Sequence, residues 1–322
     1  MEGQKVLVVG ASGFVGYRLA LHLCQNNEVY GLARFRDVRV KQQLESKGVV
    51  CISKDLSNAN LDDLPQDFDY FFNELIMTDL GSYAERQREA FELNGQLVGR
   101  LMSHCRSVRG MVQTSTSGVY RPSLAALKED DFIGPPARLA TYGISKFNGE
   151  AIATFSSNLW NIPTAILRLS YPYSDEGGLV FMFADMIAQH QPITINKSMG
   201  RCYNPIHLSD FIRYSENAVN FCSIPPRVMN AAGSEVVSIP DLLNMIGEAL
   251  GTEPIIIDTD ETQIPLTEPT FVLDTTLLTS LMGEPSVKLD EGISGVAQRI
   301  LQLKSKGDSI ILTDGKARDF EE

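Results

Sequence analysis

The sequence predicts an α/β fold, a doubly wound parallel sheet followed by a smaller, mixed C-terminal lobe. Through the first half, short apolar runs alternate with stretches at helical spacing, as in βαβ units. The first run leads directly into a glycine-rich turn and a helix pattern. The alternation then weakens. We therefore expect a first domain over 1–170, to which a helix near 206–222 returns, a second lobe over 171–314 and a polar tail over 315–322.

The composition of the 322-residue chain argues against several classes of protein. A net charge of −12 is unsuited to binding nucleic acid or an anionic membrane surface. No apolar run approaches the ~18 residues of a membrane helix, and no signal peptide is recognisable, so we expect no membrane partner. The five cysteines are scattered and odd in number. They indicate no disulfide framework and no metal site, and they fit the reducing cytoplasm.

The first strand and the turn after it predict a dinucleotide site. Val6–Val9 is apolar and mostly β-branched, as in a strand buried on both faces. Gly10 would allow a tight turn, Gly13 would let the main chain approach a pyrophosphate, and Gly16 would let the next helix pack closely. The amino end of that helix offers N–H groups and a positive dipole end to phosphates. The alternative is a glycine-rich turn without a ligand.

The second strand, over 28–33, ends at Arg34, with Arg36 close behind. Many NAD-binding folds place an acidic residue here to hold the ribose hydroxyls, whereas arginine suits a 2′-phosphate. We therefore expect NADP, with NAD possible. The alternative is that both arginines are surface residues. Asp55, after the third strand, could hydrogen-bond an adenine edge. Further strands are expected over 49–52, 69–72, 110–113 and 162–169.

A helix over about 83–105 carries an apolar stripe, with Asn94 near the expected cofactor level. Gly95 and Gly99 lie on a neighbouring face and could admit a close partner. A run of hydroxyl residues, Thr114–Ser117, then follows a strand and could bind a substrate carbonyl or hydroxyl. The alternative is an ordinary Ser/Thr turn.

Tyr142 and Lys146 lie four residues apart, so on a helix they share one face. A tyrosine hydroxyl, with an ordinary pKa of about 10, is a poor base at neutral pH. An ammonium group one turn away favours the phenolate and lowers that pKa. The pair could then exchange a proton with a carbinol oxygen. Alone, the same spacing also occurs by chance on solvated helix faces.

The second half is less regular. We expect a loop over 171–178, helices over 180–189 and from about 205–210, and a further helix capped by Ser238. In that last helix the inward-facing side chains are expected to be Leu242, Ile246, Ala249 and Leu250. His207 could be catalytic, although a lone histidine beside apolar residues is more often packed and hydrogen-bonded.

The chain resembles the extended short-chain dehydrogenase/reductases, and within them the NAD-dependent epimerase/dehydratase family, which acts largely on nucleotide sugars. The resemblance covers nearly the whole chain and rests on the order and spacing of its motifs. These are Gly10-x-x-Gly13-x-x-Gly16, Asp55-Leu56, Asn94, Ser115-Thr116 to Val119-Tyr120, Tyr142-x-x-x-Lys146, Leu167-Arg168-Leu169, Ile206-His207-Leu208-Ser209-Asp210 and Asn230-Ala231-Ala232-Gly233.

The resemblance implies a Rossmann-type sheet and a role for each matching residue. Tyr142 is implied as the acid/base, Lys146 as the residue that lowers its pKa and holds the nicotinamide ribose, and Thr116 as the residue that orients the substrate oxygen. Ser117 and Arg201 are implied in substrate binding. The implied cofactor contacts are Gly10, Ser12, Gly13, Phe14, Val15, Gly16, Arg34, Asp55, Leu56, Asn94, Ser115, Tyr142, Lys146 and Tyr171.

The sequence departs from the family pattern at several places. Ser117 and Gly118 stand where 4,6-dehydratases carry Asp-Glu, so we rank dehydration low. Tyr171 replaces an asparagine that holds a nucleotide-sugar diphosphate in many relatives. Asn73–Ile76 replaces the usual His-x-Ala-Ala. Arg34 favours consumed NADPH and hence net reduction.

We therefore expect an NAD(P)-dependent oxidoreductase that reduces a carbonyl, or oxidises the alcohol, of a sugar-like or other small metabolite. One alternative is a nucleotide-sugar epimerase that oxidises its substrate transiently with a retained NAD. Another is a non-catalytic dinucleotide-binding sensor or scaffold. We also expect a cytoplasmic homodimer that pairs through the helices near Leu93–Cys105 and Phe147–Phe155.

Overall fold

The computed structural model describes residues 1–57, 60–77, 87–121, 123–134, 140–196, 202–259 and 271–305. It divides into two compact units. The first holds Met1–Arg121, Phe132–Arg168 and Ile212–Met229, and the second holds Pro122–Asp131, Leu169–Phe211 and Asn230–Glu322. The domain ranges expected from the sequence stay a prediction.

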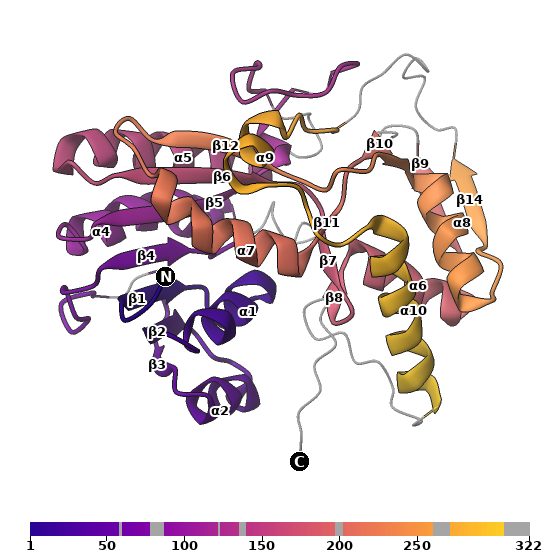
Figure 1. The fold of residues 1–322 in the computed structure, drawn as a ribbon, viewed down its shortest axis with the longest axis horizontal. Helices are drawn as coiled ribbons and strands as arrows, with labels where there is room; N and C mark the ends of the chain where they lie inside the picture. Colours follow the sequence, from indigo (N-terminus) through magenta and orange to yellow (C-terminus); the bar gives the residue numbers. More distant parts are fainter. Residues whose placement is uncertain are drawn as a thin grey trace. The chain divides into compact units, whose positions relative to one another are not determined.

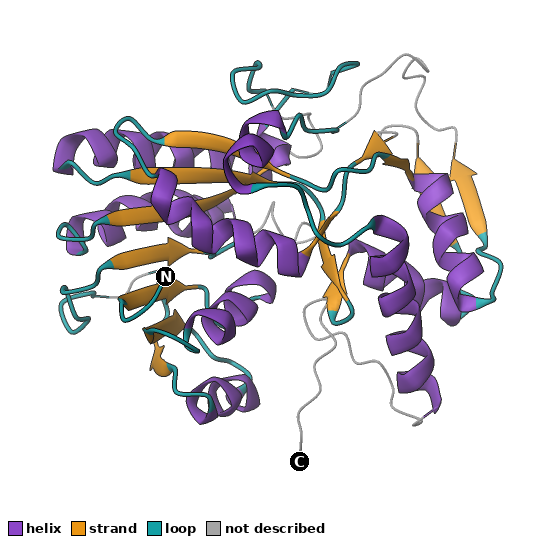
Figure 2. Ribbon diagram, viewed as in Figure 1, coloured by secondary structure: helices purple, strands orange, loops and turns teal. Residues whose placement is uncertain are grey.

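The first unit is built on a seven-stranded sheet with the order β12-β6-β5-β4-β1-β2-β3 (Figures 1 and 2). The pairs β3–β2, β2–β1, β1–β4 and β4–β5 are parallel. The chain leaves β3 at one edge and returns beside β1, so the strand order reverses between β1 and β4. This is the Rossmann-type sheet that was expected. Its strands are β1 (Lys5–Val9), β2 (Glu28–Ala33), β3 (Val50–Ser53), β4 (Tyr70–Asn73), β5 (Gly110–Thr116), β6 (Thr164–Leu169) and β12 (Arg227–Ala231).

Helices cover both faces of this sheet (Figure 1). Alternate strand residues, among them Leu7, Phe71 and Met111, join the α4 and α5 side chains in one buried cluster. The α1 and α7 helices lie on the opposite face, and His22 of α1 contacts Glu216 of α7 at 2.7 Å. The helical segments of this unit are α1 (Phe14–Leu23), α2 (Val38–Ser46), α3 (Gln87–Phe91), the π-helix η1 (Glu92–Gln96), α4 (Leu97–His104), the 3₁₀ turn η2 (Ser117–Val119), α5 (Ala140–Trp160), α7 (Leu208–Ala218, which begins in the second unit) and the 3₁₀ turn η5 (Val219–Phe221).

The close partner of the η1–α4 glycines is α5 of the same chain. A Cβ on Gly95 would lie 2.1 Å from Asn148 Nδ2, and one on Gly99 would lie 3.0 Å from Ile152. The packing is reciprocal, because a Cβ on Gly149 of α5 would lie 2.2 Å from the Asn94 carbonyl oxygen. Larger side chains at these positions would force the two helices apart. The main chain of α5 is therefore fixed against η1 and α4.

The second unit packs α6, α8 and α10 together beside short strand pairs. Ser238 caps α8 as expected, because its hydroxyl accepts from the Asp241 N–H at 3.1 Å. Two expectations were wrong: Ala249 is exposed, and the segment expected as a loop contains β7 and β8. The elements are β7 (Pro172–Ser174), β8 (Gly177–Gly178), α6 (Leu179–Ala188), β9 (Ile193–Asn196), β10 (Cys202–Tyr203), β11 (Ile206–His207), β13 (Val237–Ser238), α8 (Ile239–Leu250), β14 (Ile256–Thr259), α9 (Thr276–Met282) and α10 (Leu289–Ser305).

Candidate active site

The glycine turn after β1 has the shape that a dinucleotide cradle requires. Gly10 has a φ of +82°, and a Cβ there would lie 2.8 Å from the Leu75 main-chain nitrogen. A Cβ on Gly16 would lie 2.3 Å from the Gly10 carbonyl oxygen, so only glycine lets α1 approach the turn this closely. The α1 helix begins after Gly13 with no side-chain cap. A main-chain cradle leading into an uncapped helix start fits a dinucleotide pyrophosphate.

The exposed Arg34 side chain, which follows β2, pairs with a carboxylate. Its guanidinium Nη1 donates to Glu89 Oε1 at 3.3 Å. Asp55 lies near the same charge: hydrogen bonds from Ser57, and then the charges of Arg34 and Arg36, lower the pKa of its carboxyl group. Arginine at this position suits a 2′-phosphate, whereas a carboxylate such as that of Glu89 suits ribose hydroxyls. The structure thus has both a phosphate-binding and a hydroxyl-binding side chain after β2.

Lys146 is held by the end of β5. Only 2% of the residue is exposed, and its Nζ donates to the Thr114 carbonyl oxygen at 2.7 Å. The same oxygen accepts from Gln113 Nε2 at 3.0 Å, and Gln113 Oε1 accepts from Asn73 Nδ2 at 2.9 Å. Asn73 in turn accepts from the Leu75 N–H at 3.3 Å. A buried chain of hydrogen bonds therefore joins the ends of β4 and β5 to the lysine.

Tyr142 and Thr116 border the same point, Gly118. An ideal Cβ on Gly118 would lie 3.4 Å from Thr116 Oγ1 and 3.7 Å from Tyr142 Cε1. Thr116 Oγ1 accepts from the Gly118 N–H at 3.1 Å, which fixes the threonine rotamer. Tyr142 is half-buried in the first turn of α5, where its ring packs against Met77 and Ala90. The Tyr142 ring and the Thr116 hydroxyl therefore lie close to the same glycine.

The π-helix η1 helps to hold this arrangement. Asn94, which is 2% exposed, donates from Nδ2 to Ser145 Oγ at 3.0 Å. Ser145 Oγ in turn donates to the Tyr142 carbonyl oxygen at 2.8 Å. Asn94 therefore contacts the turn of α5 that carries Tyr142 and Lys146. π-Helical turns are frequent at functional sites.

Two buried ionisable groups near the end of β5 have shifted pKa values. Burial lowers the pKa of Lys146 to about 8, against the opposing charges of Glu74 and Glu150. Burial raises the pKa of Glu74 to about 7, although the nearby Thr114 hydroxyl, the hydrogen bond from Ser215 and the charge of Lys146 lower it. Both groups thus titrate near neutral pH, as groups at functional sites often do.

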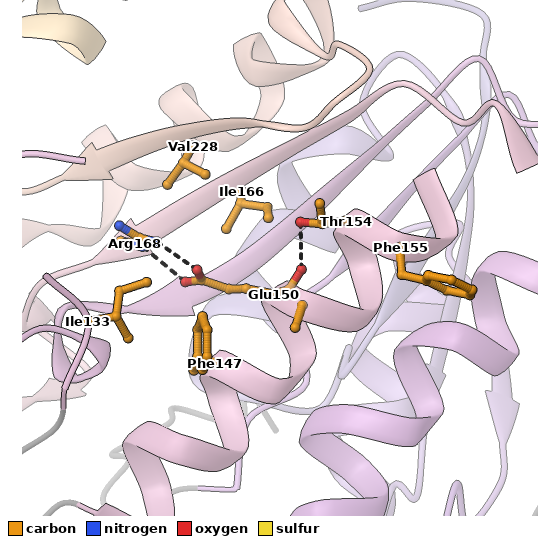
Figure 3. A pocket seen from close by; sticks show the side chains of 9 residues that line it. Ile133, Phe147, Glu150, Thr154, Phe155, Ile166, Arg168 and Val228 are labelled. Atoms are coloured by element: carbon orange, nitrogen blue, oxygen red, sulfur yellow. Dashed lines mark hydrogen bonds and ion pairs between the residues drawn. The ribbon is translucent and has the colours of Figure 1, made fainter. Parts of the chain in front are cut away.

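A second ionic group lies nearby on α5. Figure 3 shows the Glu150 carboxylate facing the Arg168 guanidinium, with bonds of 2.8 and 3.1 Å. Arg168 also donates from Nη1 to the Tyr120 hydroxyl at 2.7 Å. All three side chains are buried, so removing one charge would leave the other uncompensated. The pair is structural: it joins α5 to β6.

The remaining predicted residues are spread more widely. Ser115 and Ser117 are buried at the end of β5, and the Leu56 side chain lies in the core. Ser12, Phe14 and Val15 are half-buried at the start of α1. Tyr171 lies in the second unit with a φ of +41°, its ring 4.2 Å from that of Tyr203. Arg201 lies outside the described residues.

His207, in the second unit, is a packed and hydrogen-bonded histidine. Its Nδ1 lies 2.8 Å from Ser209 Oγ, and its ring packs edge-on against Tyr173. Burial lowers its pKa. Within the described ranges, no group of three or more His, Cys, Asp or Glu residues could hold a metal ion. The helices of the same ranges include none that is long and apolar enough to cross a membrane.

Sequence reasoning missed Glu74, Glu89 and Gln113. In the sequence, Glu74 reads as a surface carboxyl after a strand, and nothing local marks it as buried beside Lys146. Gln113 could have been found from strand geometry, since neighbouring parallel strands end together and Gln113 pairs with Asn73 in register.

The fold and this site define an NAD-dependent enzyme of the epimerase and dehydrogenase type. Residues 6–231 match the NAD dependent epimerase/dehydratase family, and the chain belongs to this family. That match includes the glycine turn, Thr116, Tyr142 and Lys146. It confirms the family that the motif order predicted.

Similar proteins are named for two kinds of activity. The chain is 25% identical to an uncharacterized UDP-glucose epimerase of Bacillus subtilis, over 77% of this chain and 83% of that one. It is also 25% identical to a dTDP-4-dehydro-6-deoxy-D-allose reductase of a Streptomyces species, over 92% and 96%. Among solved structures, a UDP-glucuronic acid 4-epimerase of Bacillus cereus, in complex with UDP-glucuronic acid and NAD, superposes with a TM-score of 0.80 at 24% identity. It covers 93% of this chain and 99% of its own.

Proposed function

We propose that this enzyme is a nucleotide-sugar epimerase that oxidises a sugar carbinol and then reduces the resulting ketone on its other face. The observation that carries the proposal is the convergence of Tyr142, Thr116 and the buried Lys146 at the end of β5. Relatives that act on UDP-glucose and UDP-glucuronic acid support the substrate class. A bound nicotinamide dinucleotide would accept the hydride and return it.

The residues of this chain would handle the proton. The Tyr142 oxygen would take the carbinol proton as the hydride leaves and give it back in the return step. The Thr116 hydroxyl would donate to the same substrate oxygen and hold it toward the phenol. Lys146, as an ammonium group, would stabilise the phenolate. The glycine cradle of Gly10, Gly13 and Gly16 would hold the pyrophosphate.

The choice of cofactor follows from the groups around Arg34. Arginine alone favours NADP, and that preference stays a prediction. Because Glu89 pairs with the same guanidinium, a 2′-phosphate would have to compete with a carboxylate. We infer that NAD is the cofactor of the epimerase. The scattered cysteines still favour the cytoplasm as its location.

The second candidate is a reductase that consumes its dinucleotide. It is favoured by Arg34 and by the similarity to the dTDP-4-dehydro-6-deoxy-D-allose reductase. Its half-reaction uses the same three residues, so the site geometry supports both candidates. They differ in whether the dinucleotide is regenerated in each cycle.

One experiment separates the two candidates. The protein is incubated with UDP-glucose, UDP-glucuronic acid or a dTDP-4-keto sugar, with NAD⁺, NADH or NADPH added, and the sugars are resolved by chromatography. Isomers formed without loss of reduced dinucleotide support the epimerase. Consumption of one dinucleotide per product would overturn the epimerase in favour of the reductase. If no dinucleotide binds in a calorimetric titration, both proposals fail.

We also propose a homodimer, which would cover an exposed apolar stripe on α5. Ile144, Phe147, Phe155 and Leu159 are between 39 and 67% exposed and lie on one side of the helix. Beside this stripe lies an apolar pocket of about 440 Å³, with the Glu150–Arg168 pair on its wall (Figure 3). Exposed apolar surface of this kind marks interaction sites.

A further inference from the structure

Glu74 is a buried carboxyl group at the edge of the dinucleotide cradle. It follows β4 directly, is 4% exposed, and donates from its main-chain nitrogen to the Val9 carbonyl oxygen at 3.0 Å. A Cβ on Gly10 would lie 2.9 Å from its carbonyl carbon. The main chain of Glu74 thus borders the glycine turn, while its side chain lies in the protein interior.

The carboxyl group is incompletely satisfied. Ser215 Oγ of α7 donates to Oε1 at 3.3 Å, whereas Oε2 has no hydrogen-bond partner among the described residues. A buried, unpaired carboxyl oxygen costs free energy, so an apolar residue would serve the core better. Packing therefore does not explain the carboxyl group at this position.

Glu74 and Lys146 both lie at the end of β5. Glu74 follows the β4 residue that pairs with Gln113, and the Lys146 Nζ donates to the next β5 residue, Thr114. Two carboxylates act on Lys146, those of Glu74 and Glu150. Glu150 is already paired with Arg168 through two hydrogen bonds, so its charge is largely matched. The Lys146 ammonium itself donates to a neutral carbonyl oxygen, that of Thr114. Glu74 is therefore the carboxylate whose charge is left to balance Lys146.

We propose that Glu74 is a positioning residue that keeps Lys146 in its ammonium form at neutral pH, so that Tyr142 retains the cation that stabilises its phenolate. This inference rests on the proposed role of Tyr142 and Lys146. The groups around the pair are the Thr114 hydroxyl on β5, Ser215 on α7 and Glu150 on α5. Of these, Glu150 alone is ionisable, and Arg168 holds it.

The shifted pKa values support this arrangement. Burial lowers the pKa of Lys146 and the charges of Glu74 and Glu150 oppose that change, which leaves the pKa at about 8. Without Glu74 the pKa of Lys146 would fall further. The lysine would then lose its proton within the physiological range, and the pKa of Tyr142 would rise.

The test is Glu74→Gln, which keeps the shape and removes the charge. The pKa of Lys146 is measured in the free protein from the ¹³Cε shifts of labelled lysine, assigned with Lys146→Arg. We expect it to fall by about one pH unit, roughly a tenfold change in the proton equilibrium. The alkaline limb of the kcat profile should shift by the same amount. Glu74→Asp should restore most of the wild-type value, and Glu248→Gln, which removes an exposed carboxyl group on α8, is the matched control.

An unchanged pKa of Lys146 in a folded Glu74→Gln variant would overturn the proposal. A fall that Glu74→Asp does not reverse would also overturn it, because the charge would then not be the cause. If Glu74→Gln fails to fold, Glu74→Asp and Glu74→Met are compared in its place. Equal pKa values of Lys146 in these two variants would also overturn the proposal. The NMR measurement needs neither substrate nor dinucleotide, so its outcome is distinct from any failure of the proposed epimerase activity.

Discussion

The Nζ of Lys146 donates a hydrogen bond of 2.7 Å to the main-chain carbonyl oxygen of Thr114. This bond attaches a helix side chain to the end of a central strand of the sheet. Since the acceptor is main chain, its position is set by the sheet and not by a rotamer. The acceptor lies two residues before Thr116 on the same strand. The sheet therefore fixes the position of Lys146 relative to Thr116.

Replacing Tyr142 by phenylalanine should abolish turnover and leave dinucleotide binding intact. The change removes only the hydroxyl group that would exchange the proton, and the ring can still pack against Met77 and Ala90. We expect kcat to fall by at least about a hundredfold and the dissociation constant for NAD to stay within about twofold. Steady-state kinetics and calorimetry check both values. Loss of dinucleotide binding would show instead that Tyr142 is structural.

Substitutions of Arg34, which follows β2, and of Glu89, in α3, should shift the dinucleotide preference in opposite directions. Arg34→Glu should weaken NADPH at least about tenfold more than NADH, because a charge-assisted contact to a 2′-phosphate is worth about 1.5–3 kcal/mol. Glu89→Gln should strengthen NADPH relative to NADH, because it releases Arg34 from its ion pair. Fluorescence titration with both dinucleotides measures the ratio. Equal effects on the two would remove Arg34 from the 2′-phosphate role.

Because α1 lies so close to the glycine turn, adding one methyl group at Gly16 should destabilise the protein. In Gly16→Ala the new Cβ would lie 2.3 Å from the Gly10 carbonyl oxygen. We expect a loss of about 1–3 kcal/mol in the free energy of unfolding, together with loss of dinucleotide binding. The control is Gly295→Ala in α10, where a Cβ meets nothing within 4 Å. It should stabilise the protein by about 0.5–1 kcal/mol, and urea denaturation measures both variants.

The buried Glu74 predicts a pH dependence of stability. Its folded pKa of about 7 lies above the ordinary value of 4.5, so the folded state binds more protons between these limits. Its contribution to stability is complete below pH 4.5 and is lost as the pH rises to about 7. Glu74→Gln lacks this loss. Its free energy of unfolding should therefore rise relative to that of the wild type between pH 5 and 8, by on the order of 3 kcal/mol. Earlier deprotonation of Lys146 acts in the same direction.

Denaturant unfolding at several pH values measures this difference. Glu248→Gln, at an exposed position on α8, should keep the wild-type pH dependence. A constant difference between Glu74→Gln and the wild type from pH 5 to 8 would contradict the prediction.

The proposed dimer can be tested on α5. Phe155 is 67% exposed, and an aspartate in its place would bring a charge into the apolar contact. In sedimentation velocity at micromolar concentration, Phe155→Asp should be monomeric while the wild type is dimeric. Leu301→Asp, at an exposed position on α10, should remain a dimer. A monomeric wild type would rule out the interface.

Local signals predicted the sheet and its cradle well. The second strand was expected over 28–33 and forms there, because its apolar run is bounded on both sides by polar residues. Gly10 and Gly16 were identified by spacing, and their contacts in the fold admit no larger side chain. These features depend on neighbouring residues, which a single sequence shows directly.

Features that depend on distant residues were not predictable. The β7–β8 pair over 172–178 is too short to show a period, and it belongs to a small sheet in which β7 also pairs with the distant β11. Ala249 lies at helical spacing from Ile246 but faces solvent, since the buried side of α8 is set by its packing on α6 and α10. The pairing of Arg34 with Glu89 and the burial of Glu74 beside Lys146 likewise arise only once the chain has folded.

The glycine contacts between η1 and α5 also bear on thermal behaviour. Gly149 brings the α5 main chain against the Asn94 carbonyl oxygen with no side chain between them, and Gly95 leaves room for the Asn148 side chain. The helix turn with Tyr142 and Lys146 is thus part of a rigid layer, and it has no hinge of its own that could loosen on warming. Heat inactivation of this site would then coincide with melting of the helices and not precede it.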